Sequence, residues 1–182
     1  MDWKDAASQW LRFAILCDVC DLNGKCIHEV GAGAGHLLDF LDQRRIAADY
    51  SGSDLSAAMV DAAHQRHPKT PFSQWDILAE SQLPTFDVLM CSGLFHVKLD
   101  HDESVWRSFV WAMVRRMYEL CKVGIAFNMI TDQVDFKIEN LYYSNPGETV
   151  DFCRRQLSRF VTLRHDYPLH EYTVYVYRND AV

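Results

Sequence analysis

The chain has few basic residues and no long apolar run. Its 18 Lys and Arg stand against 25 Asp and Glu, which gives a formal net charge of −7. This balance disfavours charge-driven binding to nucleic acid or to an anionic membrane surface. No stretch approaches the ~18 consecutive apolar residues that cross a bilayer. The first ten residues, MDWKDAASQW, lack the apolar core of a secretory signal, so we expect a cytoplasmic protein.

The six cysteines do not form a recognisable zinc motif. Cys17 and Cys20 make one C-x-x-C pair, and neither a second pair nor two histidines follow at the required spacing. His64 and His67 stand on one face of an expected helix without an evident third ligand. We therefore predict reduced thiols that fill apolar space, and no metal site.

Apolar periodicity predicts strands that alternate with helices along the chain. Helices are expected at residues 3–20, 34–45, 57–67, 103–120 and 146–160. Strands are expected at 26–31, 50–54, 71–77, 86–92 and 123–130, with two more in 161–178. Residues 131–146 fit neither pattern and are interpreted as a loop that could hold a short helix.

This order favours an α/β fold with a doubly wound, mostly parallel sheet of seven strands. The segment EYTVYVYR alternates strongly and follows a turn near Pro168, so the tail predicts an antiparallel hairpin at one edge. No repeat, low-complexity tract or linker interrupts the pattern, and residues 1–182 are expected to form one domain.

The stretch CIHEVGAGAGHLLDFL, residues 26–41, places three alternating glycines behind Glu29. Glycines after a strand let a ligand approach the backbone closely, at the sheet edge where ligands bind in open α/β folds. A dinucleotide fingerprint has G-x-G-x-x-G spacing and faces a pyrophosphate. Here the spacing is G-x-G-x-G, and a carboxylate so close would repel phosphate. The pattern favours a cationic ligand instead.

Glu-Val-Gly-Ala-Gly-Ala-Gly at 29–35 resembles the first motif of the class I S-adenosylmethionine-dependent methyltransferases. The resemblance implies a Rossmann-like methyltransferase fold, with S-adenosylmethionine as cofactor, S-adenosylhomocysteine as product and no metal. S-adenosylmethionine carries a sulfonium and an ammonium but no phosphate, which suits the carboxylate. From this motif the residues expected to bind the cofactor are Glu29, Gly31, Ala32, Gly33 and Gly35.

Three later stretches follow in the order of that family. Asp54 matches the carboxylate that accepts hydrogen bonds from both ribose hydroxyls. Asp76 matches the residue that accepts from the adenine amine, and FDVLMCSGLFHV at 86–97 matches the strand and loop beside the transferred methyl. Met59, one helical turn beyond Asp54, is expected to pack on the adenine. The neighbouring positions expected at the cofactor are Leu55, Ile77, Ser92 and Gly93.

Methyl transfer to a hydroxyl needs a general base, and His96 follows the fourth strand where a base would be useful. The alternative is a loop histidine without a role in proton transfer. For the acceptor we name Asn128, at the end of the fifth strand, with Tyr142 and Tyr143 in the segment 131–146. Asn128 could equally be a satisfied strand-end amide, and the two tyrosines could be loop anchors.

A small acceptor molecule is expected because the core nearly fills the chain. Only the N-terminal region 1–24, a candidate lid, and residues 131–146 are left to form an acceptor site, unless a homodimer completes it. The sequence favours an O-methyltransferase. N-methylation and a non-catalytic cofactor-binding subunit stay open, and an NAD-dependent dehydrogenase is disfavoured by the glycine spacing and by Glu29. His28 replaces an aliphatic strand residue and is expected to be a hydrogen-bonded core histidine.

Overall fold

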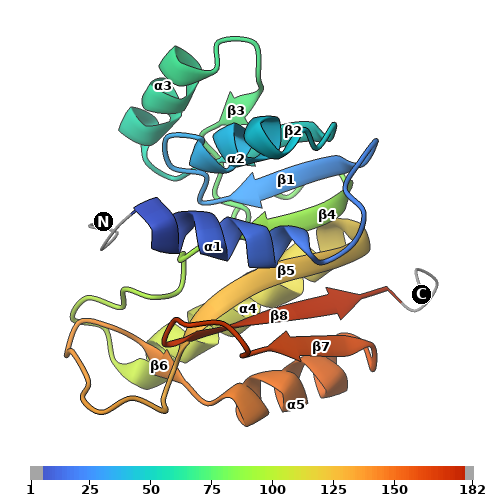
Figure 1. Cartoon of the computed structure of the whole chain (residues 1–182). Helices are drawn as coiled ribbons and strands as arrows, with labels where there is room; N and C mark the ends of the chain where they lie inside the picture. The colour runs from blue at the N-terminus through green and yellow to red at the C-terminus, as the bar shows by residue number, and fades with distance from the viewer. Residues whose placement is uncertain (1–5, 179–182) are drawn as a thin grey trace.

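One sheet organises residues 6–178, the part of the chain that the computed structural model describes (Figure 1). Its strands run in the order β3-β2-β1-β4-β5-β8-β7, and β6 pairs with β5 outside this path. The strands are β1 (Cys26–Val30), β2 (Asp49–Ser53), β3 (Phe72–Ser73), β4 (Phe86–Cys91), β5 (Cys121–Thr131), β6 (Tyr143–Ser144), β7 (Val161–Arg164) and β8 (Glu171–Tyr177).

The predicted mostly parallel sheet with an antiparallel C-terminal hairpin is confirmed. Strands β1 to β5 pair in parallel, whereas β8 runs antiparallel to both β5 and β7. The antiparallel direction of β8 brings its first residue, Glu171, beside Ile130 near the carboxyl end of β5. An acidic side chain from the tail therefore reaches the sheet edge where a ligand is expected.

Two details of the sheet differ from the prediction. The sheet has eight strands, because Tyr143 and Ser144 pair with Ile130 and Thr131. A strand of two residues leaves no periodic signal, and the short helix considered for 131–146 is absent from this described segment. The third strand is also shorter than expected, since β3 ends at Ser73 and leaves Asp76 in the following turn.

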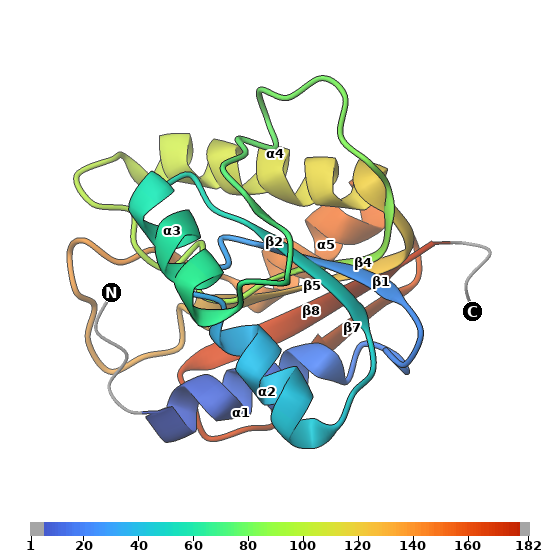
Figure 2. The same ribbon diagram turned by 90° about the horizontal axis from the view of Figure 1, so that it is seen from above.

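Helices cover both faces of the sheet, as a doubly wound fold requires (Figure 2). On one face, α1 (Ala6–Cys17), α2 (His36–Arg44) and α3 (Ala57–Arg66) share one apolar core with Ile27, Val88 and Ala126. On the other, α4 (Glu103–Leu120) and α5 (Pro146–Gln156) contribute to a second core. Among the described residues no helix is long and apolar enough to cross a membrane.

Side-chain caps set the starts of two helices. Ser56 accepts a hydrogen bond from the Met59 amide at the start of α3, and Asn145 accepts from the Glu148 amide at the start of α5, with Pro146 at the first helical position. Both starts agree with the sequence pattern. Helix α5 ends at Gln156 rather than near residue 160, so a short turn separates it from β7.

Tyr172 on β8 connects this strand with β6 and α5 through hydrogen bonds of its side chain. Its side chain is fully buried, and its hydroxyl shares hydrogen bonds with Ser144 Oγ on β6 at 2.6 Å and Thr149 Oγ1 on α5 at 2.7 Å. Because buried hydroxyls need partners, Tyr172 fixes the segment that leads from β6 into α5.

Replacing Tyr172 by Phe should lower the free energy of unfolding by about 1–3 kcal/mol, since two buried hydroxyls lose a partner. Urea unfolding followed by circular dichroism measures the change. Tyr143→Phe is the matched control, because the Tyr143 hydroxyl accepts from the amide of the exposed Ile138 and loss of this surface contact should cost no more than about 0.5 kcal/mol. Equal losses in the two variants would contradict the role given to Tyr172.

Candidate active site

The glycine turn is held tightly against the end of β2. The amides of Gly31 and Ala32 both donate to the Ser53 carbonyl, at 2.8 and 2.9 Å. Gly31 has a φ of 73°, and a Cβ there would lie 2.9 Å from Leu94 Cδ1. Gly33 has a φ of 54°, and apart from its chain neighbours no atom of residues 6–178 lies within 4 Å of the place a Cβ would take. The turn therefore needs glycine for its backbone, and the described residues leave space beside Gly33.

A cavity of about 340 Å³ lies next to this turn, on the α4 side of the sheet. Its wall is mostly apolar, and its polar groups come from Ser53, Asp54 and Asp76. The apolar part of the wall includes Trp75, Ile77, Leu78, Leu94, Phe109 and Met113. An apolar slot with a few carboxylates at its rim suits a flat base attached to a sugar.

Asp54 connects the cavity with the glycine turn. One carboxylate oxygen accepts from the Gly33 amide at 3.0 Å, and the other accepts from the Ser56 amide at 2.9 Å. A carboxylate has about four acceptor positions, so two remain for the hydroxyls of a ribose. Asp76 is exposed, and its Oδ1 accepts from the Leu78 amide at 2.9 Å. The residues present thus fit an adenosine group.

The predicted cofactor residues divide into two sets. The cavity wall contains Gly31, Asp54, Leu55, Asp76 and Ile77. The wall does not contain Glu29, Ala32, Gly33, Gly35, Met59, Ser92 or Gly93. Met59 is 45% exposed on α3, so packing of Met59 on a bound adenine stays a prediction. Gly35 has a φ of 78° and precedes α2, where it sets the end of the turn.

Glu29 lies on the α1 side of the sheet, away from the apolar cavity. It is buried, and its Oε2 accepts a hydrogen bond from the Tyr50 hydroxyl at 2.6 Å. Burial raises the pKa of this carboxyl to about 8, against the effect of the Tyr50 hydrogen bond. A cationic ligand beside Glu29 would favour its ionised form.

A buried polar network continues along the same edge of the sheet. The Asn128 Oδ1 accepts from the Gly93 amide at 2.8 Å, and its Nδ2 donates to Glu171 Oε2 at 2.7 Å. His96 is 7% exposed, and its Nε2 has no hydrogen-bond partner among residues 6–178. The hydroxyl of Ser92 is likewise buried without a partner in that range. Asn128 is therefore a satisfied strand-end amide that holds the loop after β4, while two buried polar groups of that loop have no partner among residues 6–178.

Burial lowers the pKa of His96, and the Arg12 guanidinium lowers it further. The Glu171 carboxylate and a hydrogen bond with the Asn128 backbone raise it. Burial is the largest of these effects, so the imidazole is neutral near pH 7 and has a free lone pair. A neutral imidazole in this position can accept a proton.

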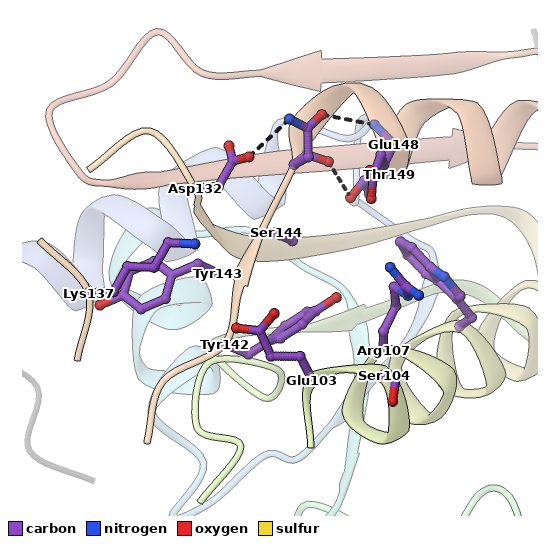
Figure 3. A pocket seen from close by; sticks show the side chains of 12 residues that line it. Glu103, Ser104, Arg107, Asp132, Lys137, Tyr142, Tyr143, Ser144, Glu148 and Thr149 are labelled. Carbon is purple, nitrogen blue, oxygen red and sulfur yellow. Dashed lines mark hydrogen bonds between the residues drawn. The ribbon is translucent and has the colours of Figure 1, made fainter. Parts of the chain in front are cut away.

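Tyr142 and Tyr143 line a second hollow, of about 370 Å³, between the starts of α4 and α5 (Figure 3). Its α4 residues are Glu103, Ser104, Arg107 and Trp111, whereas the cavity beside Asp54 contacts α4 through Phe109 and Met113. Successive helical residues are rotated by about 100°, so these two sets lie on opposite flanks of α4. The hollow and the cavity have no wall residue in common, and the geometry does not bring the two tyrosines next to Asp54.

His28 is a core histidine, as expected. Its Nδ1 and Nε2 lie 2.8 and 2.9 Å from the hydroxyls of Ser51 and Ser53, and burial lowers its pKa to about 4. His67, at the end of α3, is only partly exposed. Its Nε2 lies 3.1 Å from the carbonyl oxygen of Gly35. Within residues 6–178 no group of three or more His, Cys, Asp or Glu is placed to hold a metal ion.

Comparison with known proteins decides the family. The family described as a methyltransferase domain matches residues 28–124. A Mycobacterium tuberculosis protein named as a methyltransferase is 34% identical over 152 residues, which is 82% of this chain and 91% of that relative. The chain belongs to the class I S-adenosylmethionine-dependent methyltransferases. It is an enzyme that uses S-adenosylmethionine as its cofactor.

Solved structures agree with this fold at low identity. The N-methyltransferase NodS from Bradyrhizobium japonicum WM9 aligns with a TM-score of 0.68 at 13% identity, over 97% of this chain and 99% of that chain. The magnesium protoporphyrin IX methyltransferase from Synechocystis PCC 6803, solved with bound S-adenosylmethionine, aligns with a TM-score of 0.63 at 15% identity, over 91% of this chain and 76% of that one. The dehydrogenase interpretation is replaced by the family assignment, while the acceptor atom is left undetermined.

The sequence did not predict positions at this edge of the sheet for four residues, namely Arg12, Glu171, Phe109 and Met113. Glu171 stands in the same alternation as Thr173, opposite to Tyr172, Val174 and Val176, so the segment EYTVYVYR predicts a solvent-facing side chain there. The structure buries it, because α1 covers that face of the sheet. Its partner could not be identified, because Arg12 lies 159 residues away in the chain.

Asp54→Ala should weaken S-adenosylmethionine binding by about 1–3 kcal/mol, since the ribose hydroxyls and the Gly33 amide lose their acceptor. Isothermal titration calorimetry measures the change. Asp49→Ala is the matched control, because Asp49 is exposed at the opposite end of β2. An affinity unchanged by Asp54→Ala would exclude Asp54 from the cofactor site.

Glu29→Gln should stabilise the free enzyme at alkaline pH. The folded-state pKa of about 8 exceeds the ordinary value of 4.5, so the stability contributed by Glu29 is complete below pH 4.5 and is lost as the pH rises through about 8. The glutamine side chain of the variant stays neutral and can still accept from Tyr50. Thermal unfolding at about pH 5 and about pH 8 should show a gain for the variant only at the higher pH.

The exposed Glu139 offers a control, since Glu139→Gln should change stability equally at both pH values. A pH-independent effect of Glu29→Gln would show that the carboxyl titrates at its ordinary pH in the folded enzyme.

Proposed function

We propose that this enzyme methylates a hydroxyl oxygen of a small-molecule acceptor, with His96 as the general base. The observation that carries the proposal is the buried, neutral imidazole after β4, whose Nε2 has no hydrogen-bond partner among residues 6–178. A base is required when the nucleophile is a hydroxyl, whereas an amine attacks in its neutral form without one.

The chain's own residues have separable tasks in this proposal. Asp54 and the turn from Gly31 to Gly35 hold the nucleoside, and the apolar cavity accepts the adenine. Glu29 lies on the other side of the sheet edge, where a carboxylate stabilises a cationic group. When bound, S-adenosylmethionine supplies a methyl carbon whose bond to sulfur breaks as the acceptor oxygen bonds to it, leaving neutral S-adenosylhomocysteine.

The loop after β4 positions the base. At the start of the loop, the Gly93 amide donates a hydrogen bond to Asn128 Oδ1. At its end, the Tyr142 amide donates to the His96 carbonyl at 2.9 Å. Holding a base within a narrow range of positions contributes to the rate because less freedom must be lost in the transition state. In this proposal Asn128 and Tyr142 do not contact the acceptor but hold the loop that carries His96. Tyr143, the next residue, lies farther from the acceptor than this loop.

Several broader expectations belong to the same proposal. Residues 1–182 act as one domain, and the N-terminal region 1–24 is the candidate lid over the acceptor, with residues 1–5 outside the described part of the chain. The six cysteines are free thiols, which suits a reducing, cytoplasmic setting. A homodimer that completes the acceptor pocket stays a prediction, which sedimentation of the purified enzyme would test.

His96→Gln should lower turnover about 10²–10⁴-fold while leaving cofactor affinity nearly unchanged. Turnover is measured with methyl-labelled S-adenosylmethionine against a panel of small molecules that carry either hydroxyls or amines. His101→Gln is the control, because His101 is exposed a few residues further along the chain.

Two results would overturn the proposal. Transfer to an amine with full activity of His96→Gln would assign N-methylation. Tight cofactor binding without transfer to any acceptor, in the panel or in a cell lysate, would identify a non-catalytic cofactor-binding subunit.

A further inference from the structure

Among the buried polar groups, the His96 imidazole faces a charge that the cofactor site does not use. Its Nε2 lies 4.0 Å from Glu171 Oε2, at the first residue of β8. Both side chains are nearly inaccessible, with side-chain exposures of 9% for His96 and 7% for Glu171. At this distance the two groups interact through charge but form no hydrogen bond.

Glu171 is held from two other elements. Arg12 on α1 donates through Nε to both carboxylate oxygens, at 2.9 and 2.7 Å, and through Nη2 to Oε1. Asn128 on β5 donates to Oε2 at 2.7 Å. The carboxylate therefore cannot rotate freely, and the oxygen nearest His96 already accepts two hydrogen bonds.

The charges of this group balance only while His96 is neutral. Burial alone would raise the pKa of Glu171, but the hydrogen bond from Arg12 and the nearby His96 lower it below its ordinary value, with a further contribution from Asn128. Glu171 is thus ionised and compensated by Arg12. A proton added to His96 gives the buried group one uncompensated positive charge, and Glu171 is the carboxylate placed to stabilise it.

We propose that Glu171 is the positioning residue of His96, and that Arg12 fixes Glu171 in the orientation that this role requires. The proposal rests on the proposed function, in which His96 is the base. The Glu171 carboxylate lies 4.0 Å from Nε2, so it stabilises the imidazolium that forms when this nitrogen takes a proton. Arg12 ties this arrangement to α1, so the helix that covers the site also completes its charge balance.

The proton step follows from the orientation. With the ring proton of the neutral imidazole on Nδ1, the lone pair is on Nε2, the nitrogen that has no partner among residues 6–178. The acceptor hydroxyl gives its proton to Nε2 as its oxygen forms the new bond to the methyl carbon. The positive charge lost from sulfur then appears on the imidazolium next to Glu171, and the proton later leaves to solvent.

Two variants should move the titration of His96 in opposite directions. Glu171→Gln removes the charge that favours the imidazolium, so His96 should titrate at a lower pH than in the wild type. Arg12→Gln removes the charge that opposes it, so His96 should titrate at a higher pH. Histidine labelled at Cε1 and followed by NMR measures both shifts, with the His96 signal assigned by its absence in His96→Gln.

The control is the surface ion pair in which Arg164, the last residue of β7, contacts Asp166 in the turn before β8 at 2.7 Å. Asp166→Asn should leave the titration of His96 unchanged. Circular dichroism and calorimetric binding of S-adenosylhomocysteine confirm that each variant is folded. If one single variant fails to fold, the double variant Arg12→Met with Glu171→Gln removes both charges together and should place the His96 titration between those of the two single variants.

Opposite shifts in the two single variants support the proposal, because a purely structural contact would disturb His96 in the same direction in both. Shifts of the same sign, or none, overturn it. With an acceptor in hand, Glu171→Gln should also lower kcat and displace the acidic limb of the pH–rate profile, while the KM for S-adenosylmethionine stays the same. The NMR titration needs no acceptor, so its result is independent of whether the transfer reaction itself is correctly assigned.

Discussion

Parallel pairing is the constraint on which this site depends. Because β1, β2, β4 and β5 run in the same direction, the turn after β1, the carboxylate after β2 and the loop after β4 meet at one edge of the sheet. Strand β8 is antiparallel, so its first residue, Glu171, lies at the same edge, where it pairs with Ile130 near the end of β5. Arg12 and Glu171, distant in the chain, become neighbours because α1 packs against the sheet beside β5, the strand that pairs with β8.

Two buried carboxyls at this edge show how surroundings decide charge. Glu29 has one neutral partner, the Tyr50 hydroxyl, and burial raises its pKa to about 8. Glu171 is similarly buried, and burial is the largest single effect on its pKa, but the contributions of Arg12, His96 and Asn128 together exceed it and the pKa is lowered. At neutral pH the first is mostly protonated until a cation approaches, and the second carries a permanent charge. The same carboxyl group can therefore respond to a cationic ligand at Glu29 and supply a fixed negative charge at Glu171.

Helix α4 separates two hollows with different character. The flank with Phe109 and Met113 closes an apolar cavity beside Asp54, and the flank with Glu103 and Arg107 forms the wall of a polar hollow with Tyr142 and Tyr143. The charged partners of His96 include Arg12 on α1, on the other face of the sheet. The nucleoside end and the reacting end of the cofactor are thus expected on opposite sides of the sheet edge, with the glycine turn between them.

The sequence by itself determined the order of the helices and of all strands except β6, the glycine turn and the carboxylates at Asp54 and Asp76. These depend on local spacing and backbone preference, which a single chain displays directly. Only the tertiary structure decided that Asn128 is satisfied within the protein, that Tyr142 lines a hollow separate from the adenosine cavity and that Glu171 meets Arg12. Those outcomes depend on which strands are neighbours and which face each side chain takes, and a separation of 159 residues leaves no local trace of such a contact.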